Sequence, residues 1–252
     1  MMRNIFSFFG MGASGAVVRS SKALFDNCTI QASLPAWYSN EINKGGGLIY
    51  NDFRSKHTML ILHVWMIHKR LIIGDTGRVG KNVQECLFDE LWEDTSSRIR
   101  NIGIAELSVN KNLKDVQGYS FKCMLELDHA LTRPSEDEIV DTIGGTLWRF
   151  VYMRRNEVDV DHVLELANYI RREQKSVLTI PTSAIFDGRL DWGPLPNWSG
   201  NCVPSAKEEI NLYLKKSNPP EVNNDWQEAI APDGKIYFWN TKTRERSWKK
   251  PK

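Results

Sequence analysis

Apolar residues recur with helical spacing through the middle of the chain. Between about residues 55 and 175 they repeat every three or four positions, the period at which one face of an α-helix is apolar. Gly103 and Pro134 interrupt this pattern, and Ser135 with Glu138 three residues later forms a capping box that begins a new helix. The pattern predicts five helices, at about 55–73, 80–101, 109–131, 135–151 and 161–175. Amphipathic helices with short connections indicate a mainly α, bundle-like domain.

The pattern changes after the fifth predicted helix. Ser176–Ile180 is typical of a strand, and Asp187-Gly188 is typical of a turn. Residues 191–198 form an extended, proline-broken segment of the kind that wraps back over helices, and a further capping box predicts a short helix at 205–216. The resulting division is a helical domain at 22–198, a linker at 199–223 and a C-terminal module at 224–252.

Composition describes a globular chain with no strong charge bias. Its 252 residues are 41% apolar and 25% charged, enough to bury a core, and its net charge of +2 gives no field that favours DNA as a partner. The most apolar run, Met59–Ile67, is shorter than the ~20 residues of a bilayer span, so we expect a buried core helix there. Four cysteines without C-x-x-C spacing favour a reducing compartment.

The N-terminal segment is basic and free of acidic residues. It contains Arg3, Arg19 and Lys22, four serines and a short cluster of apolar residues. No acidic residue precedes Asp26. This composition is typical of a mitochondrial transit segment, which we place at 1–21. A secretory signal and an N-terminus with accidental charge bias are the alternatives.

No set of residues indicates catalysis or a metal site. Glu93 and Asp94 are acidic neighbours, but no histidine follows them at helical spacing, and an ion pair of Asp94 with Arg98 four residues later explains them more simply. His63 and His68 are five positions apart and lie on different helix faces, which argues against a zinc pair. The sequence therefore predicts a protein that is not an enzyme and has no cofactor.

Two short features of the helical region concern packing. Trp65 and Trp92 lie beside the apolar stripes of their helices, so we expect both to pack in the core. Gly144-Gly145 lowers the stability of a helix. We therefore expect these glycines to allow the close approach of another backbone, from this fold or from a partner.

The last thirty residues carry the pattern of a small β module. Two tryptophans enclose an Asp233-Gly234 hairpin turn and the aromatic triplet Tyr237-Phe238-Trp239, and the segment resembles the WW family. The resemblance implies a three-stranded antiparallel sheet with a mini-core of Trp226, Phe238, Asn240 and Pro251. It also implies a groove for a Pro-rich peptide, lined by Tyr237, Trp239, Thr241, Arg244 and Trp248.

The WW pattern has departures that bear on its ligand. Thr241 stands where a histidine is common, and Arg246 stands where a groove-lining threonine is common. These changes are compatible with the WW fold, but they weaken the expectation that the ligand is a Pro-rich peptide. The module is either a peptide reader or a plug that docks on its own chain or on a fixed neighbour.

Four stretches of the helical region carry a second resemblance. They read L-H-V-W-M at 62–66, L-W-E-D at 91–94, G-T-L-W-R-F at 145–150 and D-G-R-L-D-W-G-P-L at 187–195. In order and spacing they resemble the ubiquinol–cytochrome c chaperone family, which assists assembly of the mitochondrial cytochrome bc1 complex. The resemblance covers roughly 22–196, and an appended WW domain is not part of the family pattern.

The family resemblance implies a non-enzymatic protein of the mitochondrial matrix side or inner membrane. It would bind a small partner assembly factor and newly made cytochrome b. It would lie near the mitoribosome, and it could contact the membrane peripherally. The alternative is a fixed structural subunit of a respiratory complex or of the mitoribosome. The motif residues expected in the core or on a partner surface are His63, Trp65, Trp92, Glu93, Asp94, Arg98, Trp148, Arg149 and Trp192.

Overall fold

The structure is a computed structural model, and it divides into two compact units. It describes residues 14–39, 49–74, 76–155 and 158–196, together with the backbone of 226–230, 236–240 and 246–247. One unit comprises residues 1–202 and the other residues 203–252.

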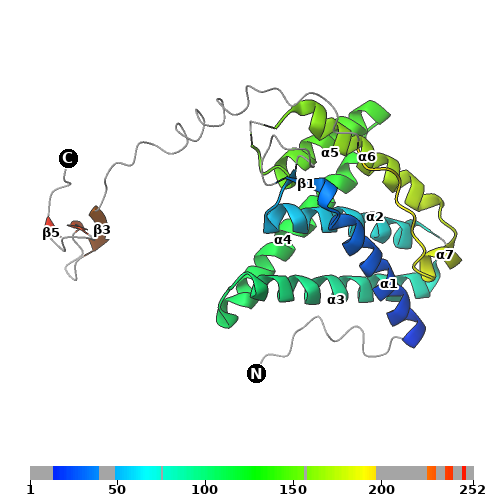
Figure 1. Cartoon of the computed structure of the whole chain (residues 1–252), viewed down its shortest axis with the longest axis horizontal. Helices are drawn as coiled ribbons and strands as arrows, with labels where there is room; N and C mark the ends of the chain where they lie inside the picture. The colour runs from blue at the N-terminus through cyan, green and yellow to red at the C-terminus, as the bar shows by residue number, and fades with distance from the viewer. Residues whose placement is uncertain are drawn as a thin grey trace. The chain divides into compact units, whose positions relative to one another are not determined.

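The first unit is built from helices around a central one (Figure 1). Helix α2 (Phe53–Ile73) packs against α1, α3, α4 and α6, and every residue from His57 to Ile67 is buried. This confirms the core helix predicted from the apolar run. The other helices are α1 (Gly15–Ala32), α3 (Gly77–Asn101), α4 (Glu106–Ala130), α5 (Glu136–Phe150), α6 (Val160–Thr179) and α7 (Thr182–Phe186).

Short elements and caps connect the helices. A 3-10 helix, η1 (Pro35–Trp37), leads into β1 (Tyr38–Ser39), which pairs in parallel with β2 (Ile49–Tyr50). Ser135 caps α5 by accepting a hydrogen bond from the Glu138 N–H at 3.2 Å, as predicted. A cap of this kind satisfies a backbone donor that the first turn of a helix leaves unpaired.

The structure corrects the sequence prediction at two places. The strand predicted at Ser176–Ile180 is wrong, because α6 continues to Thr179. Ile170, Gln174 and Val177 extend one buried helical stripe through this segment, and tertiary packing of that stripe decides the conformation. Helices α1 and α7 were not predicted, and α1 includes residues on both sides of the expected 21/22 boundary.

The segment after α7 runs back over the helices. Asp187-Gly188 forms the predicted turn, in which Gly188 has a φ of +69°. Such a left-handed conformation favours glycine. The carbonyl of Gly188 accepts a hydrogen bond from the Asn27 side chain of α1 at 2.7 Å. Residues 189–196 have no regular secondary structure, as the extended-tail prediction expected.

The second unit contains three short strands. Strands β3 (Trp226–Ile230), β4 (Ile236–Asn240) and β5 (Arg246–Ser247) lie in the order β3-β4-β5, and both pairs are antiparallel. The predicted turn at Asp233-Gly234 falls between β3 and β4, outside the described residues. The helix predicted at 205–216 and the linker at 199–223 also lie outside them.

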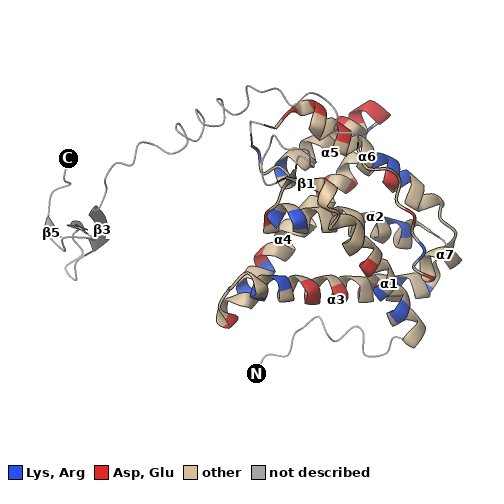
Figure 2. Ribbon diagram, viewed as in Figure 1, with Lys and Arg blue, Asp and Glu red and all other residues tan. Residues whose placement is uncertain are grey.

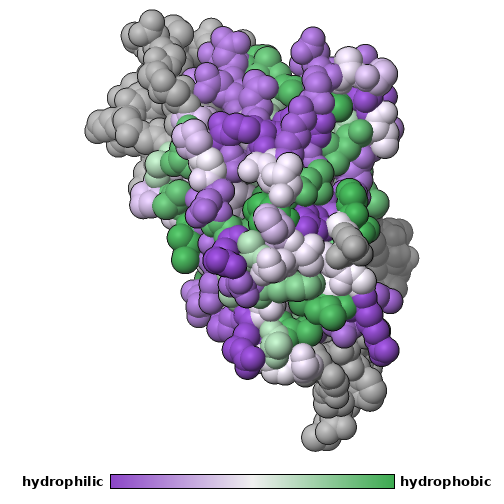
Figure 3. Space-filling model, turned by 90° about the vertical axis from the view of Figure 1, so that its right-hand side faces the viewer, coloured by the Kyte–Doolittle hydropathy of each residue, from purple (hydrophilic) through white to green (hydrophobic). Residues whose placement is uncertain are grey.

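The surface of the helical unit mixes hydrophobic and hydrophilic residues. On the face that Figure 3 shows, hydrophobic residues lie between hydrophilic ones. The exposed large apolar residues include Ile73 on α2 and both Phe121 and Leu125 on α4. Within the described residues, none of the helices combines the length and the apolar character needed to cross a bilayer.

Candidate partner-binding surface

His63 lies at the centre of a buried polar cluster between α1, α2 and α6. Its Nδ1 is 2.7 Å from the Met59 carbonyl oxygen, and its Nε2 is 3.0 Å from the Tyr169 hydroxyl. The Gln31 amide donates to the same hydroxyl at 3.0 Å. Since a carbonyl can only accept, the Nδ1 of His63 carries the proton and Nε2 accepts from Tyr169. Burial lowers the pKa of His63 to about 4, so the ring stays neutral.

The tail after α7 closes over this cluster. The Trp192 ring meets the His63 ring edge to face, with centroids 4.8 Å apart. The Gly193 N–H donates to the buried Glu173 carboxylate at 2.9 Å, and a Cβ added at Gly193 would lie 2.5 Å from that carboxylate. Two motif stretches that lie far apart in the sequence therefore meet where Trp192 contacts His63 of α2, and the Gly193–Glu173 hydrogen bond holds the same tail on α6.

Trp65 fastens α2 to α4. Its side chain is fully buried, and its indole N–H donates to the Asp128 carboxylate at 2.8 Å. The Lys69 ammonium lies 3.1 Å from the same carboxylate oxygen. The predicted core position of Trp65 is confirmed, and its polar edge forms part of an interhelical network.

Trp148 and Arg149 stabilise the connections of α5. The Arg149 guanidinium donates to the Glu126 carboxylate of α4 at 2.8 and 2.5 Å. The Trp148 indole N–H donates to the Arg155 carbonyl at 3.3 Å. A Cβ added at Gly144 would lie 3.4 Å from a methyl group of Leu164 on α6, an ordinary van der Waals contact, so the packing of α5 against α6 does not require a glycine at this position.

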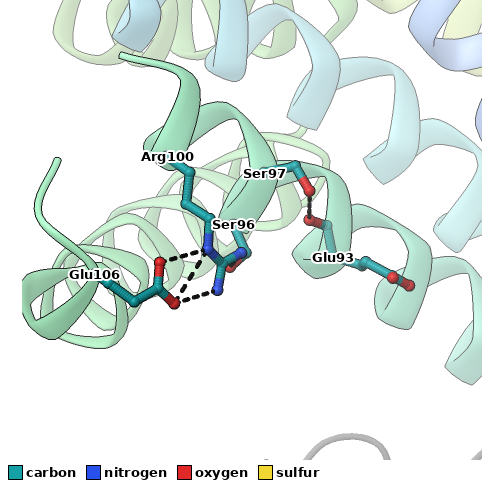
Figure 4. A network of polar contacts seen from close by, with 5 residues as sticks. All are labelled: Glu93, Ser96, Ser97, Arg100 and Glu106. Carbon is teal, nitrogen blue, oxygen red and sulfur yellow. Dashed lines mark hydrogen bonds and ion pairs between the residues drawn. The ribbon is translucent and has the colours of Figure 1, made fainter. Parts of the chain in front are cut away.

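The acidic residues at the end of the second motif make different contacts. Asp94 and Arg98 form the predicted ion pair, with 2.5 Å between the Asp94 Oδ2 and the Arg98 Nε. The Glu93 carbonyl accepts a hydrogen bond from the Ser97 hydroxyl at 3.1 Å, while the Glu93 carboxylate points away from the neighbouring Arg100–Glu106 pair (Figure 4). Across the part of the chain that the structure describes, no group of three His, Cys, Asp or Glu side chains could hold a metal ion.

An open apolar groove lies between α3 and α4. It has a volume of about 390 Å³, and its aromatic lining includes Phe88 and Trp92 from α3 and Phe121 from α4. The Trp92 and Phe121 ring centroids are 5.6 Å apart, and those of Phe88 and Trp92 are 6.3 Å apart. Trp92 is buried, while Phe121 is 44% and Leu125 68% exposed. Phe121 and Leu125 beside this groove make it a candidate interaction surface.

Acidic side chains border this groove. Glu85 and Asp89 of α3 and Asp128 of α4 line it, and Figure 2 shows acidic residues along α3. Asp128 is compensated by Lys69, but neither Glu85 nor Asp89 forms an ion pair with a cation among the described residues. Partial burial, together with the charges of Glu85 and Glu90, raises the pKa of Asp89. The rim is therefore negative and incompletely neutralised.

The structure separates the predicted motif residues into different places. His63 and Trp192 share the buried cluster, Trp65 lies at the α2–α4 contact, and Trp92 alone of the motif residues named here lines the groove. Sequence reasoning missed Phe121 and Leu125, whose i, i+4 spacing on α4 was the available signal.

The predicted WW residues are only partly placed. Trp226 begins β3, and Tyr237, Phe238, Trp239 and Asn240 lie in β4. Their side chains lie outside the described residues, as do Thr241, Arg244, Trp248 and Pro251. Their assignment to a mini-core and a peptide groove stays a prediction.

Comparison with family models decides the relationship of the helical unit. Residues 49–192, more than half of the chain, match the model described as ubiquinol-cytochrome C chaperone. The chain belongs to this family. Residues 222–251 of this chaperone-family chain match the WW domain model.

Curated relatives agree with this assignment, and a solved structure shares the fold. The chain is 26% identical over 146 residues to "Ubiquinol-cytochrome c reductase complex assembly factor 1" of Homo sapiens, a match that covers 58% of this chain and 46% of the relative. A relative of the same description in Xenopus laevis is 22% identical over 77% of this chain and 80% of its own length. The chain thus spans about half the length of the human and mouse relatives that it matches. The crystal structure of the Cbp3 homolog from Brucella abortus shares the fold, with a TM-score of 0.57 and 16% identity over 71% of this chain and 91% of that one.

Proposed function

We propose that this chain is an assembly factor for the mitochondrial ubiquinol–cytochrome c reductase complex and acts by binding rather than by catalysis. The family match over residues 49–192 is the observation that carries the proposal. Its relatives in vertebrates and in Drosophila melanogaster are described as assembly factors of that complex. The α3–α4 groove supports it physically, because a chaperone needs an open apolar surface for another protein.

We further propose binding partners and a location in the mitochondrion for this chain. The chain binds newly made cytochrome b together with a small partner assembly factor, on the matrix side of the inner membrane and near the mitoribosome. Import through the basic segment at 1–21 accounts for the composition of the N-terminus. The second candidate is a fixed structural subunit of a large mitochondrial complex that uses the same helical scaffold.

Removing the protein from its own cells is expected to deplete the assembled ubiquinol–cytochrome c reductase complex. A blue-native gel of mitochondria measures this loss, and a tagged copy measures stoichiometry. An assembly factor should be far below one copy per mature complex and should co-purify with unassembled cytochrome b. One tagged copy in every mature complex would favour the structural-subunit candidate.

We also infer that the C-terminal module folds as a three-stranded WW sheet and binds a Pro-rich segment of another protein. The match at 222–251 and the antiparallel β3-β4-β5 arrangement support this. A polyproline II segment is already extended and rigid, so it loses little conformational entropy on binding. We assign Tyr237 and Trp248 as the aromatic side chains that contact the prolines of the bound peptide.

Trp248→Ala is expected to weaken binding of a Pro-Pro-containing peptide to the full chain by about 2 kcal/mol, because groove aromatics act as hot spots. The helical unit should keep its melting temperature. Fluorescence anisotropy of a labelled peptide and thermal unfolding measure the two effects.

The control for this experiment is Trp226→Ala, which should unfold the small sheet whichever role it has. A lower melting temperature of the helical unit in Trp248→Ala would instead favour the plug alternative. Absence of peptide binding at millimolar concentration would also contradict the peptide-reader proposal.

A further inference from the structure

The α3–α4 groove has a shape that suits a helix. Its walls carry two i, i+4 pairs, Phe88 with Trp92 on α3 and Phe121 with Leu125 on α4. Side chains at this spacing form ridges along a helix, and the channel between two such ridges receives the side chains of a third helix. Both walls are helical, so their backbone N–H and C=O groups are largely bonded within each helix, and an extended strand would find few partners there.

The acidic side chains at the rim of the groove indicate which charges a bound helix should carry beside its apolar stripe. Glu85 and Asp89 lack cationic partners among the described residues, and Leu125, which lines the same groove, is 68% exposed. An occupant with a leucine-like stripe and flanking Lys or Arg would bury the apolar residues and pair the free carboxylates.

We propose that this groove binds one basic amphipathic helix of a partner protein, with its apolar stripe on Trp92 and Phe121 and its cations against Glu85 and Asp89. The proposal deepens the proposed function, on which it rests, by naming the chemistry of a protein that the assembly factor would hold.

Two other occupants fit the same surface less well. In a symmetric dimer the same patch meets itself, so the acidic rim with Glu85 and Asp89 would lie against an equally acidic rim and be repelled by it. An anionic membrane surface would be repelled by the same carboxylates. Charge complementarity therefore favours a cationic helix over a second copy or a lipid surface.

A synthetic amphipathic peptide of about 18 residues, long enough to form a helix on the groove, provides the probe. The peptide contains only Leu and Lys at helical spacing, and a matched peptide has Glu in place of Lys. Fluorescence anisotropy with the purified full chain should detect binding of the Leu/Lys peptide and at least tenfold weaker binding of the Leu/Glu peptide. Equal binding of the two peptides would overturn the proposed charge match.

Variants of exposed residues test the place of binding. Phe121→Ser with Leu125→Ser should weaken Leu/Lys binding by at least tenfold, and Leu107→Ser, on the same helix but outside the groove and 100% exposed, should leave it unchanged. Glu85→Lys with Asp89→Lys should also weaken it by at least tenfold. The exposed pair Asp141→Lys with Glu165→Lys changes the net charge equally and should have a much smaller effect. Equal effects of groove and control variants would overturn the proposal.

The oligomeric state and the cellular result separate the remaining outcomes. A dimer in solution that Leu125→Ser dissociates would assign the groove to a second copy and overturn the proposal. In cells, the double variant Phe121→Ser, Leu125→Ser should fail to support assembly of the reductase complex, whereas the control variant Leu107→Ser should support it. A normal complex with the first variant would overturn the groove as the partner site and leave the proposed function intact. A normal complex without any of the protein would instead contradict the proposed function.

Discussion

Trp65→Ala is expected to lower the free energy of unfolding by about 3–5 kcal/mol, the range for truncating a fully buried aromatic side chain. Trp65 has no exposed surface and lies on the central helix α2, so its loss leaves a cavity that the helices packed against α2 can fill only by moving. Such a loss is a large share of the ~5–15 kcal/mol that stabilises a typical domain. Urea unfolding of the full chain, followed by far-ultraviolet circular dichroism of the helices, measures it.

Two further variants separate packing from hydrogen bonding at this position. Asp128→Asn retains an oxygen that can accept from the Trp65 indole at the observed 2.8 Å, so it should cost far less than the truncation. Trp148→Ala removes a tryptophan that is only partly buried and should also cost less. A Trp65→Ala effect no larger than that of Trp148→Ala would contradict the central position that we assign to Trp65.

Acidification from pH 7 to pH 5 is expected to destabilise the helical unit by about 4 kcal/mol through two buried histidines. Burial and the charge of Arg98 lower the pKa of His57 to about 3, and burial lowers the pKa of His63 to about 4. The ordinary value is 6.5, so below that pH the unfolded chain takes up protons that the folded chain does not.

The direction of the pH effect follows from these depressed pKa values. The stability is fully present above about pH 6.5 and is lost as the pH falls from there toward the folded-state values, by about 2 kcal/mol for each histidine at pH 5. Most carboxylates stay ionised in this window, since their ordinary pKa values lie near 4. Urea unfolding at the two pH values measures the difference.

A single substitution checks which groups cause the pH dependence. His57→Phe keeps an aromatic ring beside Phe53, on which the imidazole stacks with 5.9 Å between centroids. Ser120 loses its contact with the imidazole but still donates to the Val116 carbonyl at 2.7 Å. The fall in stability between pH 7 and pH 5 should be smaller by about 2 kcal/mol in this variant, the share of His57. An undiminished fall would show that other groups carry it.

The periodic part of the sequence predicted the helical unit because local and tertiary preferences agree there. The apolar stripes of α2 to α6 are the surfaces that the fold buries, and the Ser135 hydroxyl accepts a hydrogen bond from the Glu138 N–H only three residues away. Where the two preferences differ, the prediction failed. Ser176–Ile180 has strand-like residues, but Val177 continues the buried face of α6.

Helix α1 was missed for a different reason. Its residues carry basic charges, serines and no early acidic residue, and these describe a targeting segment as well as they describe a surface helix. Leu24, Phe25 and Cys28 are nevertheless buried in the unit. Composition alone cannot distinguish the two cases, because burial depends on which surfaces the remaining helices leave uncovered.

The candidate site shows where sequence information ends. The family motifs identified the chaperone relationship, and helical spacing placed Trp65 and Trp92 on buried faces. Only the tertiary structure brought Trp192 onto His63 and set Phe121 and Leu125 of α4 opposite Phe88 of α3. Periodicity records which side of one helix is apolar, whereas a groove exists only when two helices pack at a particular angle and leave part of their apolar faces uncovered. The sequence by itself therefore determined helices α2 to α6, most of their buried faces and the family resemblance, and the packing of α3 against α4 formed the groove that we propose as a partner site.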